Sequence, residues 1–167
     1  MKQLDLFPDT SKPQDMQVPR AGDTWRVYVD GAARNNPGPA GIGIYITCNG
    51  ERVISEGFFL GSKTNNQAEY AALIVGLLLL MELIKLGDRV EIISDSELLV
   101  KQVQGLYKVR QPELQKLHRQ AVQLLQPLHY SIRHVLRKDN AVADELANRG
   151  IDTKNPLPEI VAKKVTL

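Results

Sequence analysis

The spacing of apolar residues predicts a series of short strands in the first third of the chain. Residues 25–30 alternate between apolar and polar side chains, and residues 42–46 repeat that period of two. The dipeptide Asn49-Gly50 is a strong hairpin signal, and residues 51–59 follow it as a third strand-like segment. These three segments are therefore predicted to form an antiparallel meander.

A long apolar run at residues 71–81 predicts a buried helix, because it is shorter than a membrane span requires. Asn66 and Glu69 resemble a capping box at its start, and Gly87 is the expected stop. Further elements are expected as a strand at 90–94, helices at 97–104 and 112–126, a strand at 129–137, and a helix at 141–149 capped by Asn140. Strands that follow helices pair in parallel through crossovers. The order therefore predicts an α/β fold with a five-stranded mixed sheet and helices on both faces.

The two ends of the chain differ from this body. Residues 1–24 are polar and contain three prolines, which predicts a flexible N-terminal arm. Residues 25–150 are expected to form the folded domain. Residues 151–167, with two further prolines, are expected to form a loose C-terminal tail.

Composition narrows the classes of protein. The chain has 167 residues, 43% hydrophobic and 24% charged, which suits one soluble domain. Its net charge is only +2, so binding to a polyanion would need local clusters of Lys and Arg. The single cysteine, Cys48, excludes an internal disulfide and is expected to be a strand residue rather than a nucleophile. Without a signal peptide or a membrane span, a cytoplasmic protein is expected, and a monomer.

Four carboxylates carry the candidate chemistry: Asp30, Glu69, Asp95 and Asp144. Each stands at the end of a predicted strand or in the first turn of a predicted helix, and such ends meet at one edge of an α/β sheet. Taken singly, each acid is better explained as a helix cap or a turn residue. Together, they could hold two Mg²⁺ ions about 3.5–4 Å apart, as in two-metal phosphoryl chemistry, with Mn²⁺ as an alternative.

The segments around these acids resemble type 1 ribonuclease H. The similar segments are residues 30–41, 64–70, 94–97 and 140–147, and the resemblance covers residues 25–149. It implies a ribonuclease H-like fold. It also implies an endonuclease that cuts the RNA strand of RNA–DNA hybrids and leaves 5′-phosphate and 3′-hydroxyl ends. The family's metal-binding acids map onto the four carboxylates.

Several polar and basic residues are candidates for holding the hybrid. An enzyme that distinguishes RNA from DNA must contact the 2′-hydroxyl, which amide side chains can do. The resemblance implies contacts from Asn36, Asn65 and Asn66 and a DNA-phosphate contact from Thr64. The other candidates are Gln67, Arg34, Lys108 and Arg110. Turn and cap chemistry alone would also favour Asn and Thr at these positions.

The chain departs from the family pattern at two places. Residues 105–112 join two predicted helices directly, where many members carry a longer basic protrusion. Many members also carry a loop histidine shortly before the last acid, and His134 stands ten positions before Asp144. However, His134 alternates with Ile132 and Leu136, which predicts an inward-facing core histidine rather than a mobile one.

The N-terminal peptide Gln3-Leu4-Asp5-Leu6-Phe7 resembles the motif by which bacterial replication and repair proteins bind the DNA sliding clamp. Two apolar anchors on a flexible arm suit such a role. The clamp is therefore a predicted partner beside the hybrid, and it would place the enzyme at replicating DNA in the nucleoid.

Two other readings compete with a ribonuclease H. A non-catalytic nucleic-acid-binding module would gain nothing from four clustered negative charges. Another nuclease of the same fold could cut junctions or double-stranded RNA, but the amide-rich segment 64–67 favours reading of a hybrid.

Overall fold

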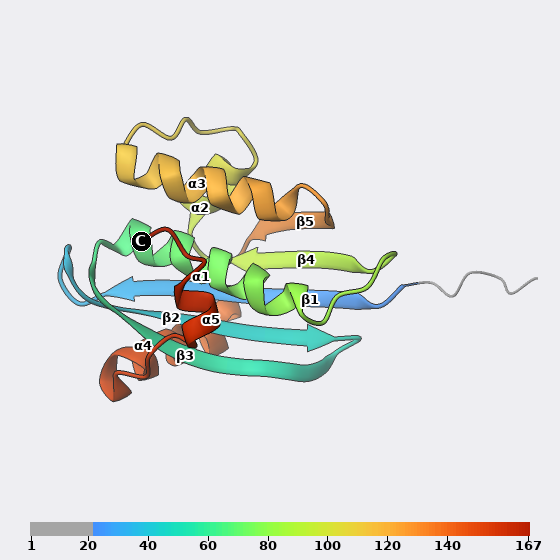
Figure 1. The fold of residues 1–167 in the computed structure, drawn as a ribbon, viewed down its shortest axis with the longest axis horizontal. Helices are drawn as coiled ribbons and strands as arrows, with labels where there is room; N and C mark the ends of the chain where they lie inside the picture. The colour runs from blue at the N-terminus through green and yellow to red at the C-terminus, as the bar shows by residue number, and fades with distance from the viewer. Residues whose placement is uncertain (1–21) are drawn as a thin grey trace, which may run out of the picture.

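The computed structural model describes residues 22–167, which form one sheet with helices on both faces (Figure 1). The strands run in the order β3-β2-β1-β4-β5. Their bounds are β1 Thr24–Ala33, β2 Gly38–Cys48, β3 Glu51–Lys63, β4 Arg89–Ser94 and β5 His129–His134. The helices are α1 Asn65–Met81, α2 Glu97–Val103, α3 Pro112–Leu125, the 3-10 turn η1 Arg137–Asn140, α4 Ala141–Thr153 and α5 Glu159–Ala162. The predicted fold class is confirmed.

Strand pairing brings the ends of β1 and β4 together. β1 pairs antiparallel with β2, which pairs antiparallel with β3, while β1, β4 and β5 run parallel. Asn49 and Gly50 both have positive φ, at 50° and 85°, as the predicted tight hairpin requires. Val29 lies opposite Ser94 on the neighbouring strand, so the residues that follow them, Asp30 on β1 and Asp95 just after β4, lie side by side.

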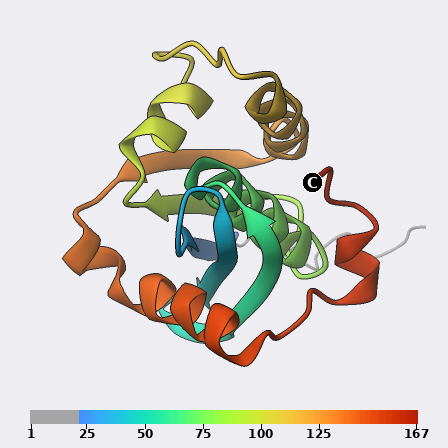
Figure 2. The same cartoon turned by 90° about the vertical axis from the view of Figure 1, so that its left-hand side faces the viewer.

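One large apolar core fills the face of the sheet that α1 covers. α1 lies against β1 and β2, and α3 packs on α1 from outside (Figures 1 and 2). α1 is therefore enclosed on most sides, which explains its continuous apolar sequence instead of a single apolar stripe. Among the described residues, none of the α4 side chains belongs to this core cluster.

α4 covers the opposite face through close contact between backbones. It crosses β1, β2 and β3, and Figure 2 shows it lying beneath the sheet. A Cβ atom on Gly43 would lie 1.9 Å from the carbonyl oxygen of Ala143, and one on Gly57 would lie 2.0 Å from that of Leu146. The two strands therefore need glycine where the helix rests on them.

Both ends of α1 differ from the prediction. α1 ends at Met81, before the expected stop at Gly87. The turn that follows is held by the carboxylate of Asp88, which accepts hydrogen bonds from the Lys85 N–H and from Trp25 Nε1, both at 2.9 Å. Its capping box uses Thr64 and Gln67 in place of the expected Asn66 and Glu69.

The C-terminal residues pack onto the domain, so the expectation of a loose tail is wrong. α4 continues to Thr153, Pro156 pairs with Phe59, and Val161 on α5 is buried in the main core. The apolar side chains of this segment cover α1, and they outweigh the prolines that suggested disorder.

Two further expectations concern other parts of the chain. Within residues 22–167, no helix is both long and apolar enough to span a membrane. The clamp-like peptide at residues 3–7 and most of the expected N-terminal arm lie outside the described residues.

Candidate active site

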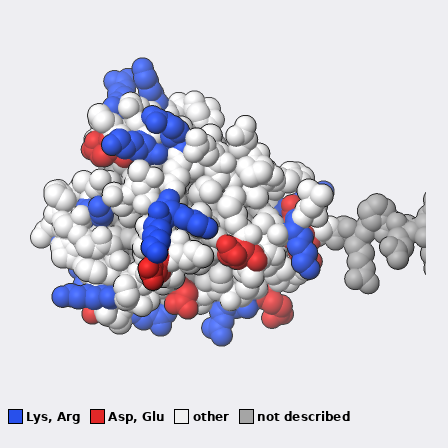
Figure 3. Space-filling view, viewed as in Figure 1, with Lys and Arg blue, Asp and Glu red and all other residues white. Residues whose placement is uncertain are grey.

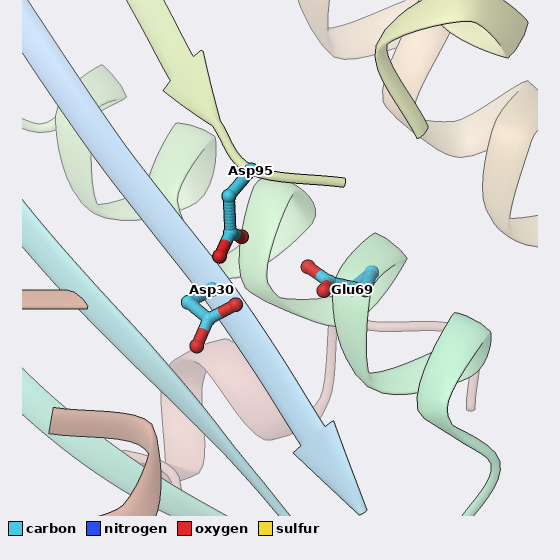
Figure 4. A group of neighbouring side chains, drawn as sticks. All are labelled: Asp30, Glu69 and Asp95. Carbon is cyan, nitrogen blue, oxygen red and sulfur yellow. The ribbon is translucent and has the colours of Figure 1, made fainter. Parts of the chain in front are cut away.

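Three of the four predicted acids meet at the edge where β1 and β4 end. Asp30 lies on β1, Asp95 follows β4, and Glu69 lies in the second turn of α1 (Figure 4). Each offers a carboxylate oxygen within 4.8 Å of the others. Figure 4 shows the three carboxylates directed toward a common space, with Asp30 and Glu69 buried.

Gly31 fixes Glu69 against Asp30. Its N–H donates to Glu69 Oε2 at 3.1 Å, and a Cβ at this position would lie only 2.2 Å from the carbonyl carbon of Ala68. The end of β1 therefore approaches the backbone of α1 more closely than any residue with a side chain would allow.

Asp144 lies at the rim of this cluster, in the first turn of α4. Asp30 pairs with Gly43 on β2, and Gly43 is the residue on which Ala143 rests, so the sheet register places Asp144 next to Asp30. Asp144 is outside the group of three acids, and its carboxylate accepts from Arg137 Nη2 at 3.2 and 3.4 Å.

The electrostatics of the cluster favour a cation among the acids. Burial, together with the charges of Asp95 and Asp144, raises the pKa of Asp30 to about 8, and burial is the largest of these causes. Burial also raises the pKa of Glu69 well above its usual range, with Asp30 and Asp95 adding to the effect. A donor set made only of carboxylate oxygens suits a hard divalent cation, which would relieve this repulsion. The residues therefore fit the expected metal.

Asn140 is a site residue whose role the sequence did not reveal. Its side chain makes no cap hydrogen bond, although α4 starts just after it as predicted. Its Nδ2 donates to the Val29 carbonyl at 2.9 Å and to Asp95 Oδ1 at 3.4 Å, while its buried Oδ1 has no protein partner among the described residues. Asn140 therefore joins the segment before α4 to both metal-facing strands. The only sequence signal was its place at the start of the 140–147 motif.

His134 is exposed, so the prediction of a core histidine is wrong. It is the last residue of β5, and its Nε2 lies 3.2 Å from the Asp95 carbonyl oxygen. Of the β5 residues only Ile132 is buried, because β5 is an edge strand and the helices do not cover its end. The alternation along β5 therefore did not indicate which of its side chains are buried. His134 lies beside the carboxylate cluster.

The amide candidates join the β1–β2 turn to the start of α1. Asn36 Oδ1 accepts from the Asn65 N–H at 3.0 Å, and Asn65 Oδ1 accepts from the Ala33 N–H at 3.4 Å. Thr64 Oγ1 and the Gln67 side chain exchange the capping bonds at 3.1 and 2.9 Å. These residues and the half-buried Asn66 therefore lie close to Glu69, and their hydrogen bonds hold the turn against the helix. Asn36 and Asn65 remain exposed.

The basic candidates fall into two groups. Arg34 pairs with Asp152 at 2.6 Å, so its charge is already balanced by α4. Lys108 and Arg110 are exposed in the loop between α2 and α3. Figure 3 shows Lys and Arg side chains gathered over α3 and this loop, on a face where charges are otherwise scattered.

Comparisons with known proteins agree with this site. The reverse transcriptase-like family model matches residues 28–150, a segment that contains all four acids. A ribonuclease HI of Halobacterium salinarum is 39% identical over 137 residues, which cover 80% of this chain and 67% of that protein. A crystal structure of RNase H1 from that organism covers 78% of this chain and 98% of its own, with a TM-score of 0.74.

Two further relatives extend the comparison. A bifunctional protein of Mycobacterium tuberculosis is 39% identical over 130 residues, which span 75% of this chain but only 35% of that protein. The structure of LC11-RNase H1, isolated from compost, is 40% identical, covers 77% of this chain and 97% of its own, and has a TM-score of 0.71. That protein was crystallised in complex with an RNA/DNA hybrid.

Proposed function

The chain belongs to the type 1 ribonuclease H family, and from that premise we propose that it hydrolyses the RNA strand of RNA–DNA hybrids, leaving 5′-phosphate and 3′-hydroxyl ends. The observation that carries the proposal is the buried group of Asp30, Glu69 and Asp95, whose oxygens lie within 4.8 Å of one another. The hybrid-bound structure of a relative with 40% identity supports the choice of substrate.

The proposed cofactor is a pair of Mg²⁺ ions, with Mn²⁺ as the alternative. When bound, such ions stabilise charge on the phosphate oxygens and make water a better nucleophile. Asp30, Glu69 and Asp95 would hold them together, and Asp144 would complete the set from α4. Arg137 now balances the charge of Asp144, so a cation at that position would take over the role of the guanidinium.

The proposed role of the amide residues is to distinguish the two strands. Asn36, Asn65 and Asn66 lie at the edge of the cluster, where their side chains would meet the minor groove and the 2′-hydroxyls of the RNA. Thr64 and Gln67, through their capping bonds, would hold the start of α1 in a position where it can bind a phosphate. Lys108 and Arg110, which are exposed in the loop between α2 and α3, would add contacts to backbone phosphates.

His134 is proposed to assist proton transfer at the rim of the site. It is exposed, and its Nε2 lies 3.2 Å from the Asp95 carbonyl oxygen, so the imidazole stands beside one of the proposed metal-binding acids. Its exposure removes the argument for a core role, and its position ten residues before Asp144 supports the proposed match to the family's loop histidine.

A cleavage assay tests the proposed activity. A labelled RNA–DNA hybrid is incubated with Mg²⁺ or Mn²⁺, beside RNA–RNA, DNA–DNA and junction substrates, with wild type and Asp95→Asn. We expect hybrid-only cutting that the substitution abolishes. A well-folded wild type that cuts no substrate with either metal would favour a binding module, and cutting of junctions or double-stranded RNA would favour another nuclease.

Recruitment by the sliding clamp is a separate part of the proposal. Residues 3–7 fit the clamp-binding pattern at all five positions, and such an arm would keep a monomeric cytoplasmic enzyme near replicating DNA. Titration with a bacterial clamp should give binding that Leu6→Ala/Phe7→Ala removes, whereas the control Met16→Ala/Val18→Ala in the same arm leaves it unchanged. Equal binding by all three proteins would exclude this recruitment.

A further inference from the structure

A pocket of about 500 Å³ lies between α3 and the loop that joins α2 to α3. It is separate from the carboxylate cluster and from the amide residues at the start of α1. The residues that define it are Gln102 on α2, Tyr107, Lys108 and Val109 in the loop, and His118 and Arg119 on α3.

The loop is held in place although it has no regular secondary structure. Gly105 ends α2 with a positive φ of 77°, after which two glutamine side chains fix the main chain. Gln102 Nε2 donates to the Lys108 carbonyl at 3.4 Å, and Gln115 Nε2 donates to the Val109 carbonyl at 3.1 Å. Because these bonds hold the main chain of the loop, binding there would cost little conformational entropy.

The lining of the pocket suits a polyanion. Lys108 and Arg119 are exposed, none of the residues described as lining the pocket is acidic, and neither cation takes part in an ion pair within residues 22–167. Tyr107 is 45% exposed, and the Lys101 ammonium lies 5.8 Å from the centre of its ring. Exposed cations of this kind are the groups that nucleic-acid backbones contact.

The pocket is tied to the catalytic cluster through one buried side chain. The Tyr70 hydroxyl donates to Gln102 Oε1 at 2.7 Å, and Tyr70 directly follows Glu69. His118 Nε2 donates to the Gln102 carbonyl at 3.1 Å, which fixes the same part of α2 to α3. In Figure 2, α2, the loop and α3 lie together on the β5 side of the sheet, so a duplex that reaches the cluster can extend over them.

We propose that this pocket holds backbone phosphates of the DNA strand of the hybrid, an inference that rests on the proposed function. The RNA strand must lie at the carboxylates and amides, so its partner strand passes to one side of the cluster. On the α4 side the candidate cation Arg34 is already paired with Asp152, whereas Lys108 and Arg119 on the other side are available. The pocket thus supplies cations for binding the hybrid in a chain whose residues 105–112 are too short to form a basic protrusion.

Hybrid binding by charge-matched variants tests this site. The parent is the cleavage-deficient Asp95→Asn protein, into which Arg119→Ala or the control Lys116→Ala is introduced. Both substitutions remove one exposed cation from α3, but Lys116 does not line the pocket. Fluorescence anisotropy between 50 and 200 mM salt should show that Arg119→Ala weakens binding about 5–10-fold and lowers the slope of log K against log salt by about one. Lys116→Ala should leave the slope unchanged.

Neutral methylphosphonate linkages then identify the strand. One linkage at a time is introduced along the DNA strand or along the RNA strand. We expect a DNA-strand position that weakens binding by the parent but has no effect on Arg119→Ala, because the two changes remove the same contact. Equal behaviour of Arg119→Ala and Lys116→Ala, or coupling only to the RNA strand, would overturn the proposal. A parent that does not bind hybrid, with a wild type that does not cut it, would overturn the proposed function as well.

Discussion

Replacing Asp30 with asparagine should stabilise the metal-free protein, and the gain should depend on pH. Asp30 is 4% exposed, and its burial beside Asp95 and Asp144 raises its pKa from 3.8 to about 8. Between pH 4 and pH 8, Asp30 is therefore protonated in the folded state but ionised in the unfolded chain. As a result, the contribution of this residue to stability is lost as the pH rises across that range. Asparagine has nearly the same shape but no charge, so it escapes the loss.

The magnitude follows from the size of the shift. One pKa unit corresponds to about 1.4 kcal/mol, so the full shift of Asp30 limits the gain to about 6 kcal/mol above pH 8. The measured gain should be smaller, about 2–4 kcal/mol, because the buried amide must still find hydrogen bonds and the neighbouring acids share the repulsion. Near pH 4 the two proteins should be almost equally stable.

Urea unfolding in EDTA at pH 4.5, 6.5 and 8.5 measures this difference directly. Glu51→Gln at the exposed start of β3 is the control, and it should stay within about 0.5 kcal/mol of wild type throughout. Excess Mg²⁺ should stabilise wild type by about 2.7 kcal/mol at a hundredfold excess over Kd, but stabilise Asp30→Asn less. Parallel curves of stability against pH for wild type and Asp30→Asn would refute the reasoning.

Three further substitutions test the support of the site. Gly43→Ala should lower the free energy of unfolding in urea by about 2–3 kcal/mol and reduce kcat, since its Cβ would push α4 and Asp144 away from the sheet; unchanged values would contradict the packing described. His134→Ala should leave Tm unchanged but lower kcat about 100-fold, and a fully active variant would remove His134 from the chemistry. Asn140→Ala should destabilise by about 1–3 kcal/mol and weaken Mg²⁺ binding in calorimetry, because it frees Asp95 and leaves a buried carbonyl unpaired; normal Mg²⁺ affinity would limit Asn140 to a structural role.

Much of the fold was predictable because its signals are local. The Asn49-Gly50 hairpin, the alternation before Asp30 and the apolar run of α1 each depend on neighbouring residues alone, and the structure has all three. The capping box shows the limit of such signals. Both Thr64–Gln67 and Asn66–Glu69 have suitable residue types, but the carboxylate of Glu69 accepts a hydrogen bond from the Gly31 N–H on β1 instead.

The parts of the site that the sequence did not predict depend on contacts between distant residues. Arg34 was expected to hold phosphate, yet it pairs with Asp152 on α4. His134 alternates like a core residue, but whether alternation means burial depends on which helix covers the strand, and the end of β5 is uncovered. Asn140 has the residue type of a cap, and only the assembled sheet shows that its amide reaches Val29 instead.

The contact between α4 and the sheet also affects how the molecule opens. Glycines let the helix lie directly on the strands, and its own buried side chains are mostly small, so releasing it exposes little apolar surface compared with the core around α1. α4 should therefore exchange its amide hydrogens through a sub-global opening, well before the α1 side unfolds. Asn140 and Asp144 would leave with it, while Asp30, Glu69 and Asp95 stay in place on the intact half. A ligand that bridges both halves would close this opening, so slowed exchange in α4 would reveal binding at the site even without turnover.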